Sequence, residues 1–348
     1  MDKRIDNLDY LRGLMAIVIM IYHYNAWLYG ALPSDSTLSR LGIYGVSAFY
    51  VLSGLTLFLV YSERLVVRNL PSYFLKRILR IYPLLWISIL LNIFLLNKTY
   101  PTEKLWLNFT GAFGFVAPRE YISTGAWSIG NELVFYVFFP LIVLLSRRFK
   151  YGIWLCFGVS VLVGYYFAFH MLDPEIPLGD QWDEYINPFN QLFLFVGGMF
   201  VAFFYNGYKN VKLGWSLFLL AILIFVIWPA SGNRIALITE NNRLVFSTVT
   251  ILFTISFLII PNRKIKFLSS ILKVLGHISY SIYLIHPIVF WYLNRFLQKG
   301  EEPVKFFLIS SLITLILSLL VYYLVESRFI RLGKSLVTNR LNKRAEGQ

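Results

Sequence analysis

Residues 42–61 read GIYGVSAFYVLSGLTLFLVY, a run of 20 positions without one charged side chain. A helix of about 20 apolar residues is long enough to cross the hydrocarbon core of a bilayer. Runs of this kind recur along the chain. They lie near residues 13–30, 42–61, 81–97, 126–145, 152–171, 188–206, 214–230, 244–261, 278–297 and 305–325. The sequence therefore predicts an all-α bundle of about ten transmembrane helices.

The composition agrees with a chain that lies in lipid. Of its 348 residues, 57% are hydrophobic and only 14% are charged, which is too apolar for a water-soluble globule of this size. Aromatic residues make up 18%, a share that suits lipid-facing surfaces and interfacial belts of Tyr and Trp. The single cysteine, Cys156, excludes a disulfide framework and a CxxC metal site, and we expect no metal. No small-residue cleavage site follows the first apolar run, so we expect that run to remain as a membrane helix.

The positive charges are placed as topology signals. The net charge is +14, but the basic residues are scattered between the apolar runs and form no long tract of the kind that binds nucleic acid. With the N-terminus in the cytoplasm, 23 of the 32 lysines and arginines fall in cytoplasmic segments and the remaining nine fall outside. This asymmetry follows the positive-inside rule and predicts that both termini are cytoplasmic. We expect one membrane domain over residues 1–333, followed by a basic cytoplasmic tail over 334–348.

Ionisable side chains inside the predicted helices are candidates for function, because lipid makes them costly. His23 follows Arg12 by eleven residues on the first predicted helix, which places it about 16 Å deeper in the membrane. An imidazole there suits a general base for an acceptor hydroxyl, but it equally suits a structural hydrogen bond to a neighbouring helix. Glu132 opens the fourth predicted helix from the outer side. It could orient His23 or an acceptor, or it could be a carboxylate at the membrane interface.

Two arginines lie at the cytoplasmic entry to the third predicted helix. Arg77 and Arg80 are three residues apart and so share one helix face. Paired guanidinium groups in a partly dry site bind phosphates, although arginines also flank most cytoplasmic helix ends. Arg12 leaves the same two interpretations open. His286 also lies within a predicted helix, but Pro287 after it predicts a helix break and a structural role.

Small residues are spaced along the second predicted helix, at Gly42, Gly45, Ser47 and the pair Ser53-Gly54. They would let neighbouring helices approach closely, so packing is their first interpretation. The sequence contains no GxSxG, HExxH, Walker or Rossmann glycine motif. The usual support for a soluble hydrolase, a zinc protease or a nucleotide-hydrolysing enzyme is therefore absent, and any chemistry must take place within the bundle.

Six motifs, in order along the chain, resemble those of the membrane acyltransferase-3 family. They are Asp9 to Gly13 (DYLRG) with His23, Gly45 to Gly54 (GVSAFYVLSG), Lys76 to Pro83 (KRILRIYP), Trp127 to Glu132 (WSIGNE) with Tyr136 and Pro140, Ser279 to His286 (SYSIYLIH), and Val325-Glu326. The resemblance covers nearly the whole chain, and six motifs in the right order would rarely coincide.

The resemblance implies a reaction and a division of labour. Family members transfer an acyl group, commonly acetyl, from cytoplasmic acyl-CoA to a hydroxyl of a glycan or glycolipid on the far side of the cell membrane, here expected to be a bacterial plasma membrane. The match implies that His23 is catalytic and that Arg12, Arg77 and Arg80 bind the acetyl-CoA. The cations lie inside and the histidine lies deep, a distance that a pantetheine arm could span.

Departures from the family pattern refine these expectations. Many members have Asp where this chain has Ser47, so an orienting role falls more heavily on Glu132. Members that act on peptidoglycan often carry an extracytoplasmic domain, and its absence favours a glycan O-acetyltransferase without one. We expect small polar and aromatic side chains to line the pocket and to bind the acceptor or the thioester oxygen, namely Ser53, Trp127, Asn131, Tyr283 and His286.

Two alternatives remain open at the level of sequence. A secondary transporter or exporter of a glycan or an acyl-containing metabolite would also be a ten-helix bundle with a few buried ionisable residues, although no inverted repeat is evident. Within the enzymes, a succinyl or longer acyl group could replace acetyl. The sequence does not decide the acceptor sugar and hydroxyl, direct transfer against an acyl-histidine intermediate, or the oligomeric state.

Overall fold

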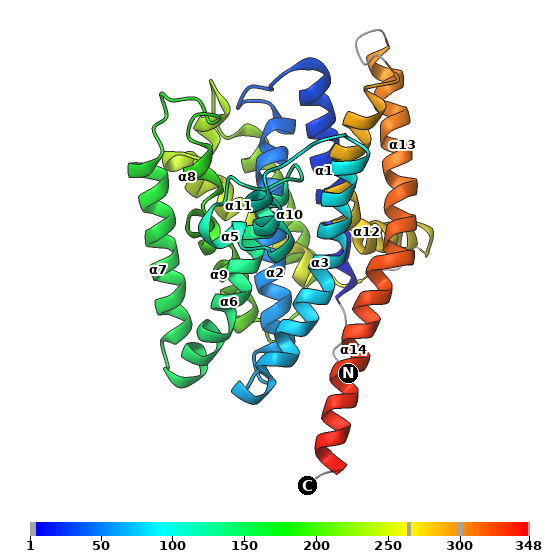
Figure 1. Ribbon diagram of the computed structural model, residues 1–348. Helices are drawn as coiled ribbons and strands as arrows, with labels where there is room; N and C mark the ends of the chain where they lie inside the picture. Colours follow the sequence, from blue (N-terminus) through cyan, green and yellow to red (C-terminus); the bar gives the residue numbers. More distant parts are fainter. Residues whose placement is uncertain (1–4, 263–265, 298–301, 347–348) are drawn as a thin grey trace. The chain divides into compact units, whose positions relative to one another are not determined.

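The computed structural model describes residues 5–262, 266–297 and 302–346, and within these ranges it contains helices and loops but no strand (Figure 1). Each of the ten predicted membrane helices coincides with a helix. These are α1 (Asp6–Tyr29), α2 (Thr37–Tyr61), α3 (Leu70–Phe94), α6 (Ala126–Arg148), α7 (Gly152–Tyr166), α9 (Pro188–Phe204), α10 (Val211–Ile227), α11 (Glu240–Ile259), α12 (Lys266–Leu293) and α13 (Pro303–Val321). Eight helical segments of the described residues are long and apolar enough to cross a membrane. The chain is therefore an all-α, multi-pass membrane protein, as predicted.

Two of the ten helices, α1 and α10, lie outside that set of eight for different reasons. The helix α10 is apolar but has only 17 residues. The helix α1 has 24 residues, but it includes Arg12, His23 and Asn25, which lower its mean hydropathy. Polar groups kept in a membrane helix are candidates for function, so α1 is the first place to look for a site. The orientation, with both termini in the cytoplasm, stays a prediction.

Short helices occupy the connections between the long ones. They are η1 (Val67–Asn69), α4 (Thr102–Thr110), α5 (Phe113–Val116), η2 (Phe167–Met171), α8 (Trp182–Ile186) and η3 (Arg234–Leu237). At the C-terminal end, the π-helix η4 (Tyr322–Glu326) joins α13 to α14 (Ser327–Glu346) in one long helical segment, drawn in orange to red in Figure 1. Residues 334–346, predicted as a basic tail, thus continue a helix.

The chain divides into two compact units, which we describe separately. Unit 1 comprises Met1–Glu63 and Leu141–Ser279, and unit 2 comprises Arg64–Pro140 and Tyr280–Gln348. The helices α6 and α12 each contribute to both units. The division interleaves the two halves of the sequence, and the predicted boundary at residue 333 stays a prediction.

In unit 1, glycines bring α2 and α9 into backbone contact. A Cβ atom placed on Gly54 would overlap the carbonyl oxygen of Phe195, and one placed on Gly198 would overlap that of Val51. Small residues permit this approach because van der Waals packing, and not the exclusion of water, holds helices together in lipid. The packing role predicted for Gly54 is confirmed.

Two further helix contacts of unit 1 depend on glycine residues. Gly42 faces the ring of Tyr22, and a Cβ atom on Gly45 would lie 2.9 Å from Cγ1 of Ile19, so α2 lies close against α1. A Cβ atom on Gly13 of α1 would lie 2.7 Å from the backbone nitrogen of Gly276 in α12. The predicted close approach of helices at Gly42 and Gly45 is therefore present.

A buried arginine of unit 1 caps a helix. Arg40, in the first turn of α2, is 2% exposed. Its Nη1 donates to the carbonyl oxygens of Phe225 (2.7 Å) and Val226 (3.0 Å), and its Nε donates to that of Ser34 (3.0 Å). The last carbonyls of a helix have no partner within that helix, and they carry its negative partial charge. Arg40 therefore binds the C-terminal end of α10.

A second buried arginine of unit 1 joins three helices. Arg243, in the first turn of α11, is 1% exposed. Its Nη2 donates to Oε1 of Gln191 in α9 at 2.9 Å. Its guanidinium carbon lies 5.3 Å from the centre of the Phe193 ring and 6.0 Å from that of the Tyr44 ring in α2. An amide oxygen and two ring faces thus surround this cation.

Unit 2 contains a small apolar core around the connection between α3 and α6. Its buried members are Leu85, Ile89, Leu107, Phe113, Ile122 and Ala126. Asn108 organises the loop after α5, since its Nδ2 donates to the carbonyl of Glu120 (2.6 Å) and its Oδ1 accepts from the backbone N–H of Ile122 (2.9 Å). The segment that precedes α6 is therefore packed and hydrogen-bonded.

Candidate active site

His23 lies in the last third of α1 and contacts two aromatic rings of its own helix. Its ring stacks on Trp27, one turn further along, with the ring centres 5.1 Å apart and the ring planes 14° apart. The centre of the Tyr22 ring lies 5.4 Å away at an interplanar angle of 46°. The His23 side chain is half-buried. This arrangement orients the imidazole and leaves part of it accessible, which suits a group that exchanges a proton with a bound molecule.

Arg234 is a neighbour of His23 that sequence reasoning missed. It opens η3, and its Nη1 donates to the hydroxyl oxygen of Tyr22 at 2.9 Å. It also lies close enough for its positive charge to act on the His23 ring. These residues are about 210 positions apart in the chain, and no motif or periodicity links them. The one signal in the sequence was that Arg234 is among the few cations on the predicted outer side.

The other two predicted site residues of unit 1 lie along the contact between α1 and α2. Arg12 donates from Nη1 to Oδ1 of Asp9 (3.1 Å) and from Nη2 to Oγ1 of Thr56 (2.8 Å). Arg12 therefore links α1 to α2. Ser53 is 8% exposed and immediately precedes Gly54 at the crossing of α2 and α9. The predicted roles of Arg12 in donor binding and of Ser53 in the pocket stay predictions.

In unit 2, Arg77 is the first member of a chain of contacts that leads to Glu132. The Arg77 guanidinium carbon lies 5.8 Å from the centre of the Tyr136 ring. The Tyr136 hydroxyl donates to Oε2 of Glu132 at 3.1 Å, and the Tyr73 hydroxyl donates to the Tyr136 carbonyl at 3.2 Å. The structure thus connects a predicted donor-binding arginine on α3 with a predicted catalytic carboxylate on α6 through one tyrosine.

Arg80, one turn beyond Arg77 on α3, lies near a buried carboxylate. Glu326 is the last residue of the π-helix η4 and is 4% exposed. Its Oε2 accepts from the Ser281 hydroxyl at 2.9 Å, and Arg80 is close enough for its charge to act on this carboxylate. The Tyr280 hydroxyl donates to the Ile81 carbonyl at 3.0 Å. Sequence reasoning quoted Glu326 only within a motif, because it falls just beyond the end of a predicted helix.

The predicted pocket residues of unit 2 lie on α6 and α12. Trp127 and Asn131 on α6 and Tyr283 on α12 are all buried. The Tyr283 hydroxyl lies 2.9 Å from the Ser128 hydroxyl and donates to the Gly125 carbonyl at 3.1 Å. Gly125 has φ of +85°, which a residue with a side chain rarely adopts. The turn before α6 is therefore fixed against Tyr283.

The predicted helix break at Pro287 is wrong. The helix α12 runs from Lys266 to Leu293 with Pro287 inside it. His286 is 1% exposed, and its Nδ1 donates to the carbonyl oxygen of Ile282 at 2.9 Å. Neighbouring helices and local side chains can stabilise a membrane helix that contains proline, so the loss of one N–H group does not end it here. The structural role expected for His286 stays a prediction.

The predicted site residues thus form two groups. Unit 1 holds Arg12, His23 and Ser53, and unit 2 holds Arg77, Arg80, Trp127, Asn131, Glu132, Tyr283 and His286. Within unit 2 the structure connects Arg77 with Glu132, and within unit 1 it surrounds His23 with Tyr22, Trp27 and Arg234. The predicted orientation of His23 by Glu132 joins residues of different units and stays a prediction.

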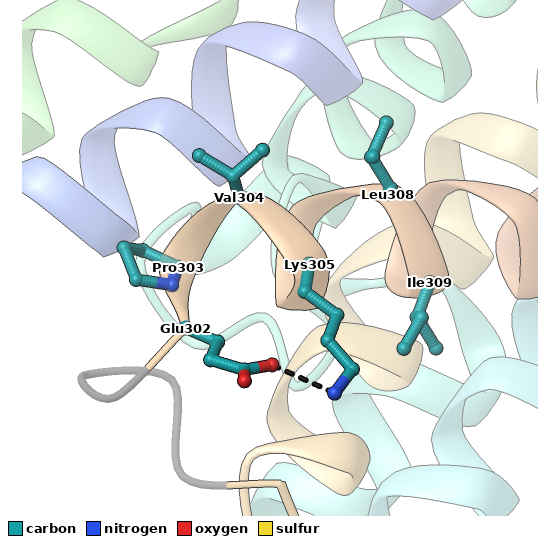
Figure 2. A pocket seen from close by; sticks show the side chains of 6 residues that line it. All are labelled: Glu302, Pro303, Val304, Lys305, Leu308 and Ile309. Carbon is teal, nitrogen blue, oxygen red and sulfur yellow. Dashed lines mark ion pairs between the residues drawn. The ribbon is translucent and has the colours of Figure 1, made fainter.

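A surface hollow at the start of α13 contains none of these residues. Figure 2 shows its lining, which is Glu302, Pro303, Val304, Lys305, Leu308 and Ile309. Lys305 Nζ pairs with Glu302 Oε2 at 2.7 Å, and both side chains are more than 60% exposed. An exposed pair of this kind contributes little to stability. In residues 5–262, 266–297 and 302–346, no group of three or more His, Cys, Asp or Glu side chains is arranged to hold a metal ion.

The sequence of the chain is similar to those of known acyltransferases. The sequence profile of the acyltransferase-3 family, described as an acyltransferase domain, matches residues 5–323. The O-acetyltransferase OatA of Staphylococcus aureus, from strains NCTC 8325 and COL, is 28% identical over 95% of the chain. The chain spans 58% of the length of these relatives. No solved structure matches it.

Proposed function

The chain belongs to the acyltransferase-3 family, and on that premise we propose that it transfers an acetyl group from cytoplasmic acetyl-CoA to a hydroxyl of an extracytoplasmic glycan or glycolipid. The observation that carries the proposal is the placement of His23, a half-buried imidazole oriented by Trp27 inside a membrane helix. The relatives named as O-acetyltransferases support an oxygen acceptor and the acetyl group. We place the reaction in a bacterial plasma membrane, because the relatives are bacterial and the helices are apolar.

We assign the phosphates of CoA to the arginine pair on α3. Arg77 and Arg80 share a helix face, and the Arg80 side chain is exposed. A guanidinium group donates two parallel hydrogen bonds to a phosphate, which gives both affinity and orientation. Arg12 is the third candidate. It already donates to Asp9 and Thr56.

His23 then supplies the chemistry of transfer. In the direct route, its imidazole accepts the proton of the acceptor hydroxyl while the oxygen attacks the thioester carbonyl carbon. The carbon–sulfur bond breaks, and the proton passes from His23 to the sulfur of CoA. In the two-step route, the imidazole nitrogen takes the acetyl group first and passes it to the acceptor oxygen. Both routes convert an alcohol and acetyl-CoA into an acetyl ester and free CoA.

The side chains on α6 and α12 of unit 2 are suited to acceptor binding. Trp127 offers a ring on which a sugar can stack, and Asn131 and Tyr283 offer hydrogen-bonding groups. Glu132 accepts from Tyr136, and a carboxylate can accept further hydrogen bonds from a sugar hydroxyl or an imidazole.

The test is transfer of radiolabel from acetyl-CoA in proteoliposomes that present the predicted cytoplasmic face to the donor. We expect His23→Ala to lose label transfer and to keep CoA affinity. We expect Arg77→Ala to weaken CoA binding by about tenfold, the loss of roughly 1.4 kcal/mol for one charge-assisted contact. Tyr151→Phe, on an exposed loop residue, is the matched control and should behave as wild type.

The outcomes separate the parts of the proposal. Full transfer by His23→Ala would contradict the role of the histidine and leave the acyltransferase class intact. Uptake of a glycan without any label transfer would contradict the enzyme and favour a transporter. Transfer from succinyl-CoA in preference to acetyl-CoA would change the proposed acyl group to succinyl and leave the proposed site residues unchanged.

A further inference from the structure

Arg234 differs from the other cations at its end of unit 1 in how its guanidinium group is used. Arg40 donates to three backbone carbonyls, and Arg243 lies against two aromatic rings and an amide oxygen. Within the described part of the chain, Arg234 has one hydrogen bond, to Tyr22, and no carboxylate within ion-pair distance. A guanidinium group has five N–H donors. Most of the N–H groups of Arg234 therefore make no hydrogen bond to the described part of the chain.

The loop that carries Arg234 is fixed by hydrogen bonds from its neighbours in unit 1. The Tyr44 hydroxyl donates to the Leu237 carbonyl at 2.5 Å, and Asn242 Nδ2 donates to the Ala236 carbonyl at 2.8 Å. At the other end of the loop, the backbone N–H of Ser34 donates to the Gly232 carbonyl at 3.1 Å. Residues of the α1–α2 loop, α2 and α11 therefore hold η3 in place, and Tyr22 directs the side chain itself.

A cation that is fixed beside a catalytic imidazole is placed where acyl transfer develops negative charge. When an oxygen nucleophile adds to a thioester, the carbonyl oxygen becomes an anion in the tetrahedral intermediate. Donors that already point at this oxygen stabilise it without reorganisation, and they have more effect in a site that excludes water. His23 must lie within hydrogen-bonding distance of the attacking oxygen, so the carbonyl oxygen lies within a few ångströms of the imidazole.

We infer that Arg234 is a catalytic residue, whose guanidinium donates hydrogen bonds to the anionic carbonyl oxygen of the donor during transfer at His23. The inference rests on the proposed function. The acceptor oxygen forms a bond to the carbonyl carbon, its proton passes to the imidazole, and the carbonyl electron pair moves to the oxygen that Arg234 binds. The electron pair then returns, the carbon–sulfur bond breaks, and the sulfur takes the proton from His23.

The experiment compares Arg234→Gln, Arg234→Lys and Tyr22→Phe in the proteoliposome transfer assay, with separate measurements of CoA affinity and thermal unfolding. We expect Arg234→Gln to lower kcat by about 10²- to 10³-fold, the effect of one lost oxyanion donor, with CoA affinity and the acceptor KM unchanged. Arg234→Lys keeps a charge without the planar fork and should retain part of the rate. Tyr22→Phe removes only the orienting hydroxyl and should lower kcat by about three- to tenfold.

The controls separate a catalytic role from a structural one. Arg119→Gln makes the same change at an exposed residue on the same predicted side and should keep the wild-type rate. A raised acceptor KM with unchanged kcat in Arg234→Gln would overturn the inference, and so would a rate loss matched by a lower unfolding midpoint. No label transfer by the wild type would instead contradict the proposed function.

Discussion

Units 1 and 2 both carry ionisable side chains among their helices, and apart from the Arg12–Asp9 pair of unit 1 they hold them in different ways. In unit 1, Arg234 and Arg243 have neutral partners, a tyrosine hydroxyl for the first and an amide oxygen with two ring faces for the second. In unit 2, the Ser281 and Tyr136 hydroxyls donate to the carboxylates Glu326 and Glu132, and arginines of α3 lie nearby.

The difference bears on where an anion that forms beside His23 can be stabilised. A cation with neutral partners keeps its full attraction for negative charge, whereas an arginine beside a carboxylate has part of that charge balanced. Arg234 is half-buried beside His23, so the attraction acts where an acyl group would react. Arg243 is only 1% exposed, so its neutral partners serve the packing of the helices and not the binding of an anion.

The largest expected effect is a loss of stability in unit 1. Gly198→Val places a branched side chain against the Val51 carbonyl at the crossing of α2 and α9, where the backbone must move to admit it. We expect a loss of about 3 kcal/mol or more and poor recovery of folded protein, measured as thermal unfolding in detergent. Gly158→Val is the control, because no atom lies within 4 Å of a Cβ at that exposed position. Equal stability of the two variants would contradict the close crossing.

The next effect tests the carboxylate of unit 2. Glu326→Leu leaves the buried Ser281 hydroxyl without its acceptor, and we expect a loss of about 2 kcal/mol. Glu326→Gln keeps an oxygen at the same position and should recover most of that stability. The double variant with Ser281→Ala should be less destabilised than the sum of the single changes, since both remove one contact. Additive losses in this cycle of unfolding measurements would show that the two side chains are independent.

A smaller effect sharpens the role of Arg243 in unit 1. Arg243→Lys keeps the charge, but an ammonium group cannot both reach Gln191 and lie flat between the Tyr44 and Phe193 rings. We expect a loss of about 1–2 kcal/mol in the same unfolding measurement. Arg119→Lys, at an exposed position, should leave the midpoint where it is. A wild-type unfolding midpoint in Arg243→Lys would mean that only the positive charge at this position contributes to stability.

The smallest effect separates the two contacts of Tyr136 in unit 2. Tyr136→Phe removes the hydroxyl that donates to Glu132 and keeps the ring beside Arg77. We expect a loss of about 0.5–1 kcal/mol of stability and unchanged CoA affinity. Tyr151→Phe, on a side chain that is 65% exposed, is the control for loss of a hydroxyl. A fall in CoA affinity with Tyr136→Phe would show that the hydrogen bond to Glu132 also positions Arg77.

The sequence was enough to predict the helices and part of their packing. Each of the ten apolar runs coincides with a helix, because a membrane leaves the backbone no other way to satisfy its hydrogen bonds, whereas the long polar helix α14 gave no such signal. Gly54 was assigned to packing from its size alone, and it lies at the crossing of α2 and α9. The prediction of a helix break at Pro287 was wrong because it applied the rule for water-soluble helices to a membrane helix that its neighbours support.

The candidate site was predictable only where a residue was unusual in its own segment. His23 is unusual because it lies in an apolar helix, and Arg77 and Arg80 because of their spacing. Glu326 and Ser281 are 45 positions apart and Arg243 and Gln191 are 52 apart. Each of these pairs depends on how two helices pack side by side, and no local pattern encodes that. Arg234 lies in a loop, where a single arginine has many ordinary explanations.

The π-helix η4 determines how the helical segment from α13 to α14 would respond to the loss of one residue. A π turn holds one residue more than an α turn, so the five residues of η4 rotate the chain by nearly the same angle as four α-helical residues, about 400°. Gly333 faces α3, where a Cβ atom would lie 3.3 Å from Cδ1 of Leu79. Deleting one residue of η4 would therefore restore regular α-helix and keep that face toward α3, whereas the same deletion elsewhere in α13 would rotate everything after it by about 100°.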